Sequence, residues 1–397
     1  MAVVGIISEY NPFHLGHAWQ IAELRRRLGA DTAVVCAMSG NFVQRGECAI
    51  MEKHARAEAA LHGGADLVLE LPLPWAISSA ESFAAGGVGV LAAAGVVDTL
   101  AFGSECGNGE RLMRLAERLL SEEFSAALKA RLGAGTSYAS VRAAAMRDLV
   151  GDEAALLERP NDILGVEYCK AIRAGKVPMS VLALERRGVD HDGGAKDGFA
   201  SASFIREKLR AGEDASDYLT SQSAAAYYRE ANGGCAPAGL NYAERAILSK
   251  LRSMTEEDFA AYDGGGEGLY HRFYAAVQSA RSMEEILELA KTKRYAHARL
   301  RRMLLAAFLG VPSAAELEIP YLHVLGCNGR GRELLAAMKK SASVPVITKS
   351  AEARRLPSPA KELFALEARS TDQYVLLYPQ LSASVAGSEW TRGPVIL

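Results

Sequence analysis

The chain has 397 residues, 49% of them hydrophobic and 23% charged, and its formal net charge is −2 at pH 7. These values are typical of an ordinary soluble globular protein. The balanced charge neither requires nor excludes a nucleic-acid partner, because a local basic patch can bind phosphate on a neutral protein. The length exceeds what one hydrophobic core normally supports, so we expect two domains, or one large domain with an appendage.

Cysteine usage and apolar runs indicate the compartment. The six cysteines are scattered singly with no C-x-x-C pair, which argues against a zinc site or a disulfide framework and favours a reducing environment. The longest apolar stretch, FAAGGVGVLAAAGVVDTLAFG, contains an Asp and many small residues, so it fits a helix followed by a strand better than a membrane span. The first residues lack the features of a secretory signal. We expect a cytoplasmic protein with no membrane partner.

Short apolar runs alternate with helical stretches from the first residues to about Glu105. The predicted strands are AVVGIIS, TAVVCAM, ADLVLELP and DTLAFGS, and the predicted helices lie near 18–28, 53–62 and 80–94. Strands that are apolar on consecutive residues fit a sheet covered on both faces, and the alternation implies right-handed crossovers between parallel strands. The predicted fold class is therefore α/β with a doubly wound parallel sheet.

The pattern changes along the rest of the chain. Helices are predicted from 109 to 149, then a strand at VPMSVLALER and a helix at SASFIREKL. From about residue 213 the periodicity becomes mainly helical, with helices at 243–253, 256–262, 269–279, 283–291 and 297–308. After Pro320, YLHVLGCNGRGRELLAAMKK and VPVITK indicate a smaller mixed unit. We place the domains at 1–212 and 213–397, the second mainly helical.

Polar residues follow the predicted strands, where ligands bind in a doubly wound sheet. Glu70 and Glu105 follow two of them and could act as general bases, but carboxylates at strand ends often cap neighbouring loops, so we assign them no catalytic role. The segment SGNFVQRGE follows another strand, and its Asn41, Gln44 and Arg45 favour a ligand over a solvated loop.

His14 and His17 flank Gly16 just before a predicted helix. Imidazoles placed there can reach phosphate oxygens beside the free N–H groups of the helix N-terminus, and Gly16 allows a nucleotide to approach the backbone. A histidine can donate a hydrogen bond as charge develops during attack at an α-phosphorus. The alternative is a helix cap with two incidental histidines, and the motif alone does not decide between them.

The segment SASFIR, residues 201–206, supplies two hydroxyl groups and a guanidinium at another predicted helix start. Ser and Thr are common N-caps, so this segment alone indicates capping. Together with H-x-G-H at the start of an α/β domain, it matches the second signature of the nucleotidylyltransferase superfamily.

At family level the chain is similar to the bacterial tRNA(Met) cytidine acetate ligases. The motifs that carry the resemblance are EYNPFHLGH, SGNFVQRGE, GADLVLELP, AFGSE, RPNDILGVEY and SASFIR, with a weaker likeness in TKRYAHARLRRMLL and YLHVLGCNGRGRELL. The resemblance implies an ATP-dependent ligase that forms acetyl-adenylate and pyrophosphate, then acetylates N4 of the wobble cytidine of elongator tRNA(Met). The chain departs from the family at Cys48, where a proline is usual, and at Asp190, near a usual aromatic residue.

The resemblance also implies roles for individual residues. His14, His17 and Arg206 are the implied catalytic residues. The implied ATP-binding residues are Ile7, Ser8, Glu9, Tyr10, Asn11, Pro12, Phe13, His14, Leu15, Gly16, His17, Ala18, Trp19, Gln20, Gly103, Asn161, Arg186 and Ser203. Arg187 is an alternative to Arg186, and without the resemblance Asn161 would only start a helix after Pro160. ATP is expected as substrate with Mg²⁺ helping, the metal ligands are unknown, and no tightly bound organic cofactor is expected.

A basic run before and within a predicted helix is the strongest local positive charge in the chain. It contains Lys291, Lys293, Arg294, His297, Arg299, Arg301 and Arg302, interrupted by Tyr295. Such a helix suits the phosphate backbone of RNA, with the aromatic ring free to stack on a base. The alternative is a solvated helix face. Because the second domain needs a purpose beyond adenylation, we favour tRNA binding and expect no DNA partner.

Two other functions remain open at this stage. A nucleotidylyltransferase that adenylates a small phosphorylated metabolite would share the first domain, but it would leave the helical domain and the basic run without an RNA role. A non-catalytic RNA-binding protein with a degenerate nucleotide fold is disfavoured, because both phosphate-binding signatures are intact.

Overall fold

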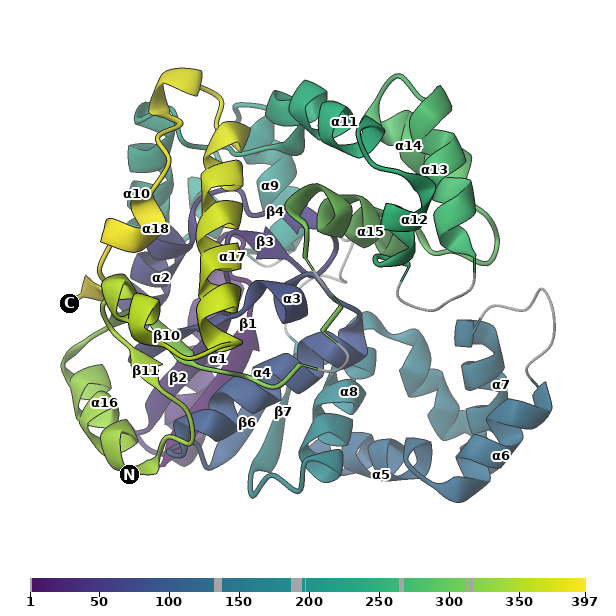
Figure 1. Cartoon of the computed structure of the whole chain (residues 1–397). Helices are drawn as coiled ribbons and strands as arrows, with labels where there is room; N and C mark the ends of the chain where they lie inside the picture. The colour runs from purple at the N-terminus through teal and green to yellow at the C-terminus, as the bar shows by residue number, and fades with distance from the viewer. Residues whose placement is uncertain are drawn as a thin grey trace.

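The computed structural model describes residues 2–131, 138–186, 195–196, 198–263, 268–311, 313–314 and 317–397. Figure 1 shows a central sheet with helices on both faces and a second group of helices beyond the ends of its strands. Over the described residues, the main sheet has the strand order β11-β10-β5-β2-β1-β6-β7, and β12 pairs with β10. Arg187 and Asp190 lie outside the described residues.

The parallel part of the sheet comes from the first half of the chain. Its strands are β1 Val3–Ser8, β2 Ala33–Ser39, β5 Leu67–Leu71, β6 Thr99–Ser104 and β7 Ser180–Glu185. Helices α1 Leu15–Leu28 and α2 Lys53–His62 cover one face, and α4 Ala80–Ala94, α5 Gly109–Leu119 and α8 Pro160–Ala174 cover the other. Val4 and Ile6 of β1 face the first group, whereas Val3 and Ile7 face the second. The predicted doubly wound α/β class is confirmed.

The segment after Pro320 does not form a unit of its own, so that expectation was wrong. Strand β10 (Leu322–Cys327) pairs antiparallel with β5, and β11 (Val346–Ile347) and β12 (Val395–Ile396) pair with β10. All of β10 is buried. A strand this apolar needs cover on both faces, and periodicity does not indicate which sheet supplies it. The boundary at residue 212 stays a prediction.

The predicted mainly helical region forms as expected. Its helices are α11 Glu244–Arg252, α12 Glu256–Ala260, α13 Leu269–Ser279, α14 Met283–Ala290 and α15 His297–Leu309. They share a core with α17 (Ala360–Tyr374), which the sequence did not predict, and with the hairpin of β3 (Phe42–Val43) and β4 (Glu47–Cys48). Cys48 is buried in this core, where burial raises the pKa of its thiol to about 12. The hairpin thus joins the helical region to the sheet.

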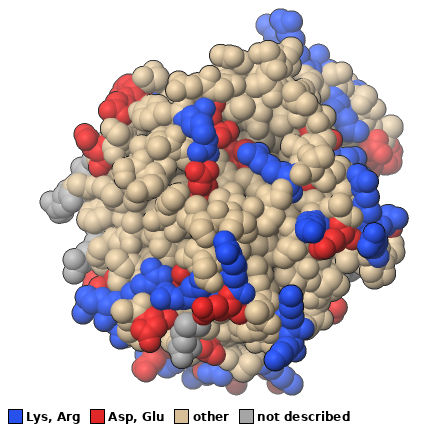
Figure 2. Space-filling model, turned by 90° about the vertical axis from the view of Figure 1, so that its left-hand side faces the viewer, with Lys and Arg blue, Asp and Glu red and all other residues tan. Residues whose placement is uncertain are grey.

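Shorter or peripheral elements complete the fold. They are α3 Leu73–Ala76, α6 Glu122–Arg131, α7 Tyr138–Val150, β8 Ala195–Lys196, β9 Phe199–Ala200, α9 Ala202–Arg210, α10 Ser221–Asn232, α16 Gly329–Ser341 and α18 Ser388–Thr391. Among the described residues, we find no helix with the length and apolar character that a membrane span requires. On the face at the left of Figure 1, both acidic and basic side chains are present among the residues that the structure describes (Figure 2).

Candidate nucleotide-binding site

A cavity of about 330 Å³ lies at the carboxyl ends of β1, β6 and β7. β1 is flanked by β2 on one side and β6 on the other, so the cavity lies at the point where the strand order reverses. Ligands of doubly wound folds bind at this position because loops from neighbouring strands diverge there. The N-termini of α1 and α8, the β3–β4 hairpin and the start of α9 complete its wall.

Most of the predicted ATP-binding residues line this cavity. They are Ile7, Ser8, Glu9, Tyr10, Asn11, His14, Gly16, His17, Trp19, Gln20, Gly103, Asn161 and Arg186, together with Arg206. Within the described chain, the members of the predicted set that lie outside its lining are Pro12, Phe13, Leu15, Ala18 and Ser203. Phe13 is instead fully buried, and its backbone oxygen accepts a hydrogen bond from the Ser223 hydroxyl at 2.6 Å. The sequence thus located the cavity, and the nucleotide contact of each residue stays a prediction.

His14 and His17 together cap helix α1. The Nδ1 atom of His14 accepts a hydrogen bond from the backbone N–H of Gly16 at 3.0 Å. The Nδ1 atom of His17 accepts one from the backbone N–H of His14 at 3.2 Å, which makes a reciprocal capping box. The structure therefore combines the two alternatives for this motif, since the histidines cap the helix and also line the cavity.

These hydrogen bonds fix the protonation of both rings. A ring nitrogen that accepts a hydrogen bond carries no proton, so each neutral imidazole is protonated at Nε2. Burial, together with the nearby Arg186 and Arg206, lowers the pKa of His14 to about 3. Burial and the charge of His14 lower the pKa of His17 well below its usual value. Both histidines are therefore neutral near pH 7 and can act as hydrogen-bond donors rather than as cations.

A chain of three side chains includes two residues of the cavity lining, Asn161 and Arg186. Glu105 caps helix α8 by accepting hydrogen bonds from the backbone N–H groups of Asn161 and Asp162. The same carboxylate accepts from the Asn161 side-chain amide at 2.6 Å, and the Asn161 oxygen accepts from Arg186 at 3.2 Å. Gly103 lies against Arg186, since a Cβ at Gly103 would be 3.3 Å from the Arg186 Cγ. Glu105 thus caps helix α8 and orients Asn161, which in turn holds Arg186.

Arg206 reaches the cavity from helix α9. Its guanidinium donates to the backbone oxygen of Asn11 at 2.9 Å and to the Ser203 hydroxyl at 3.2 Å. Among the described residues, the buried Nε of Arg206 and the buried Nδ2 of Asn11 have no hydrogen-bond partner. Unpaired buried donors are costly, so they suit a site that receives an anionic or polar ligand. Ser203 touches the site only through Arg206.

Arg56 is a residue that the sequence reasoning missed. It is fully buried and donates hydrogen bonds to the backbone oxygens of Met51 at 3.0 Å and Ser39 at 3.1 Å, and also to those of Glu9 and Gly40. One guanidinium therefore ties together the loops that follow β1 and β2. No sequence signal identifies it, because a charge on a short helix normally indicates a solvated face.

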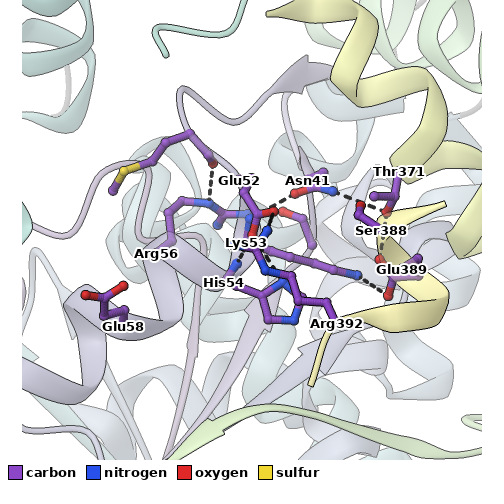
Figure 3. A network of polar contacts seen from close by, with 12 residues as sticks. Asn41, Glu52, Lys53, His54, Arg56, Glu58, Thr371, Ser388, Glu389 and Arg392 are labelled. Atoms are coloured by element: carbon purple, nitrogen blue, oxygen red, sulfur yellow. Dashed lines mark hydrogen bonds and ion pairs between the residues drawn. The ribbon is translucent and has the colours of Figure 1, made fainter. Parts of the chain in front are cut away.

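Lys53 and Glu70 belong to a buried ion-pair cluster outside the cavity lining. The Lys53 ammonium contacts Glu70 at 2.7 Å and Glu389 at 2.7 Å, and His323 contacts Glu70 at 2.7 Å. Figure 3 shows Lys53 pointing toward Glu389. Glu70, His323 and Glu389 are spaced as metal ligands could be, but the ammonium already pairs with both carboxylates.

The basic run divides into exposed and partly buried members. Lys291, Lys293 and Arg294 are exposed just before α15, whereas the others on α15 are partly buried. Arg299 pairs with Asp263 at 3.1 Å and Arg301 with Glu47 at 2.8 Å. Burial lowers the pKa of Arg302 to about 10.

Two further observations concern the surroundings of the basic run. Tyr295 is buried in the helical core, so the expectation that its ring stacks on a base was wrong. Hydrophobic periodicity could not show that this core encloses the ring. Gly46, at φ +74°, is so close to α15 that a Cβ on this residue would be 2.5 Å from the backbone nitrogen of Arg302. The β3–β4 hairpin, which places Gln44 and Arg45 on the cavity wall, therefore packs directly on the basic helix.

Comparison with known proteins agrees with this geometry. A family model described as HIGH Nucleotidyl Transferase matches residues 1–388. A protein of Acetivibrio thermocellus named tRNA(Met) cytidine acetate ligase is 35% identical over 418 residues, which cover 100% of both chains. A protein of Syntrophomonas wolfei with the same name is 36% identical over 415 residues, covering 100% of this chain and 99% of its own.

Solved structures show the same likeness. The apo crystal structure of Thermotoga maritima TmcAL has a TM-score of 0.94 and 32% identity, and the match covers 100% of both chains. The structure of Thermotoga maritima TmcAL bound with alpha-thio ATP has a TM-score of 0.92 and 33% identity, again over 100% of both chains.

Proposed function

This chain belongs to the HIGH nucleotidyl transferases and, within them, to the family of tRNA(Met) cytidine acetate ligases, and we propose that it joins acetate to a cytidine of elongator tRNA(Met) at the expense of ATP. The observation that carries this proposal is the pair of neutral histidines at the N-terminus of α1, which faces the cavity at the sheet switch point. Nε2–H donors, a helix N-terminus and two guanidinium groups converge there, and together they fit a triphosphate.

In the first step, a carboxylate oxygen of acetate attacks the α-phosphorus of ATP. The bond from that phosphorus to the oxygen bridging the β-phosphate breaks, giving acetyl-adenylate and pyrophosphate. His14 and His17 donate hydrogen bonds from Nε2 to phosphoryl oxygens, and Arg206 supplies positive charge. These donors are already oriented by the capping box and by Asn11, so little reorganisation accompanies the reaction.

In the second step, the N4 amine of the wobble cytidine attacks the acetyl carbonyl. The bond to the AMP oxygen breaks, AMP leaves, and the amine loses a proton to a base that we do not assign. An anticodon-loop base is already unpaired, so no duplex has to open. The basic run is the proposed tRNA contact, because it packs on the hairpin that borders the cavity.

Mg²⁺ would accompany the nucleotide. Mg²⁺ retains water and binds phosphate oxygens together with one or two carboxylates, and Glu9 offers a carboxylate on the cavity wall. Bound there, the ion would offset phosphate charge. No other metal ligand is assigned among the described residues.

The test is incubation of the full chain with ATP, labelled acetate and a tRNA(Met) transcript. Label is expected in tRNA only when ATP is present, and not in a transcript whose wobble cytidine is replaced by uridine. Transfer of AMP to a phosphorylated small molecule without tRNA, or ATP binding without turnover, would overturn the proposal.

A further inference from the structure

The loop between β2 and α2 is held at both of its ends by residues from the far end of the chain. This loop, residues 41–52, carries Gln44 and Arg45 to the cavity wall and leads directly into α2 at Lys53. The backbone N–H of Gln44 also donates to the Glu9 carboxylate at 2.9 Å, so the loop contacts the turn after β1. Its position therefore shapes the nucleotide cavity from one side.

Four residues close this loop in a ring of hydrogen bonds, most of which Figure 3 shows. The backbone N–H of Lys53 donates to the Asn41 side-chain oxygen at 2.9 Å, and the Asn41 amide donates to the Thr371 hydroxyl at 3.3 Å. The Thr371 hydroxyl donates to one oxygen of Glu389 at 2.9 Å. The other oxygen of Glu389 accepts from the Lys53 ammonium at 2.7 Å, which completes the ring.

The ring is buried. Lys53 is 1% exposed, Glu389 is 2% exposed and Asn41 is 5% exposed. The Lys53 ammonium also donates to both oxygens of Glu70, at 2.7 and 2.9 Å. In a low-dielectric interior such bonds are strong when complete and costly when broken, so the ring has one well-defined geometry.

A second contact lies beside the ring. Glu52 caps helix α2 by accepting from the His54 backbone N–H at 2.8 Å, and it forms an ion pair with Arg392. The Arg392 side chain is 44% exposed, so this contact can be changed with little effect on the core. Glu389 and Arg392 thus hold two successive residues, Lys53 and Glu52, at the start of α2.

We propose that Thr371 and the C-terminal segment around Glu389 and Arg392 are positioning elements of the nucleotide site. They fix both ends of the loop that carries Gln44 and Arg45 without touching the cavity themselves. The inference rests on the proposed function for the identity of the nucleotide. It concerns ATP affinity rather than the chemical step, so the expected effect is on KM for ATP and on ATP binding.

The sharpest test compares Thr371→Val with Thr371→Ser. Valine keeps the shape of threonine and removes the hydroxyl that joins Asn41 to Glu389, whereas serine keeps the hydroxyl. For Thr371→Val we expect the KM for ATP and the Kd for ATP to rise on the order of threefold to tenfold, with kcat at saturating ATP nearly unchanged. Thr371→Ser should restore values close to wild type.

Arg392→Gln should move KM in the same direction by a smaller factor. The matched control is Arg229→Gln, because Arg229 pairs with Glu58 on the same helix α2 but away from its N-terminus. Thermal unfolding of every variant reports the folded fraction. Wild-type KM and Kd in a folded Thr371→Val protein, or an equal shift in Arg229→Gln, would overturn the inference. Direct ATP binding separates the two proposals, since failure of the wild type to acetylate tRNA would leave the binding comparison intact.

Discussion

The imidazole rings of His14 and His17 stack with their centroids 3.7 Å apart, at the first turn of helix α1. Each ring accepts a backbone hydrogen bond at Nδ1, so the two Nε2–H groups are the donors left for a ligand. One pair of residues therefore both starts the helix and supplies the donors proposed to contact the phosphates.

Substitutions at His14 can separate these two tasks. Asparagine places its side-chain oxygen near the position of Nδ1 and keeps the cap, whereas glutamine places its amide near Nε2 and keeps the donor. We expect His14→Asn to remain folded and to lose about 100- to 1000-fold in kcat, as loss of an oriented donor does elsewhere. His14→Gln should retain more activity. Wild-type turnover of His14→Asn in a steady-state acetylation assay would contradict the role.

The low pKa of His14 predicts how stability changes with pH. An unfolded histidine titrates near 6.5, whereas folded His14 titrates at about 3. Between these values the unfolded chain binds more protons, so the stability contributed by His14 is complete above about pH 6.5 and decreases as the pH falls toward 3. Thermal unfolding at pH 7.5 and pH 5 should therefore show a smaller loss in His14→Asn than in the wild type. An equal loss in both proteins would argue against a buried, neutral His14.

Asn161 joins Glu105 to Arg186 across one wall of the cavity. Asn161→Ala removes both contacts and releases Arg186, so we expect the KM for ATP to rise about tenfold, corresponding to roughly one hydrogen bond. Asn108→Ala is the matched control, since Asn108 caps the neighbouring helix α5 outside the cavity. The control should lose about 1 kcal/mol of stability with an unchanged KM. Equal KM values in the two variants would exclude a role for Asn161 in nucleotide binding.

The exposed part of the basic run should contribute most to tRNA affinity. Lys291→Glu combined with Lys293→Glu is expected to weaken tRNA binding about tenfold near 0.1 M salt. The slope of the logarithm of the binding constant against the logarithm of the salt concentration should decrease in magnitude by about one to two. Formation of acetyl-adenylate without tRNA should not change. The same double reversal at Lys339 and Lys340, exposed at the end of α16, controls for net charge. Filter binding over a salt series measures the affinity and its salt dependence for both double variants. Identical effects in the two variants would argue against the basic run as the tRNA contact.

The cavity was predictable because its residues are close in sequence or follow strands. H-x-G-H precedes a helix, and the cap at His14 involves atoms no more than three residues apart. Gly103 lies near the end of β6 and Arg186 follows the neighbouring parallel strand β7, so the two residues come together whenever the sheet forms. Local hydrophobic patterning thus indicated the sheet and the edge at which a ligand binds, whereas Gly103 and Arg186 were named through the resemblance to the family.

The roles of several charged residues could not be predicted in this way. Arg56, Lys53 and Tyr295 look exposed from their neighbours in the sequence, yet each is buried in the fold. Lys53 meets Glu389, 336 positions away, and Asn41 meets Thr371, 330 positions away. A sequence pattern records which side chains can ionise, but not which of them are enclosed.

The apolar strands and the helix starts at H-x-G-H and SASFIR were therefore readable in the chain alone, because capping and periodicity act over a few residues. The packing of the whole chain decided that β10 completes the same sheet, that Tyr295 is closed to a base and that the end of the chain holds the loop beside the nucleotide cavity. Those outcomes depend on burial and ion pairing between distant segments, whose free energies exist only once the segments meet.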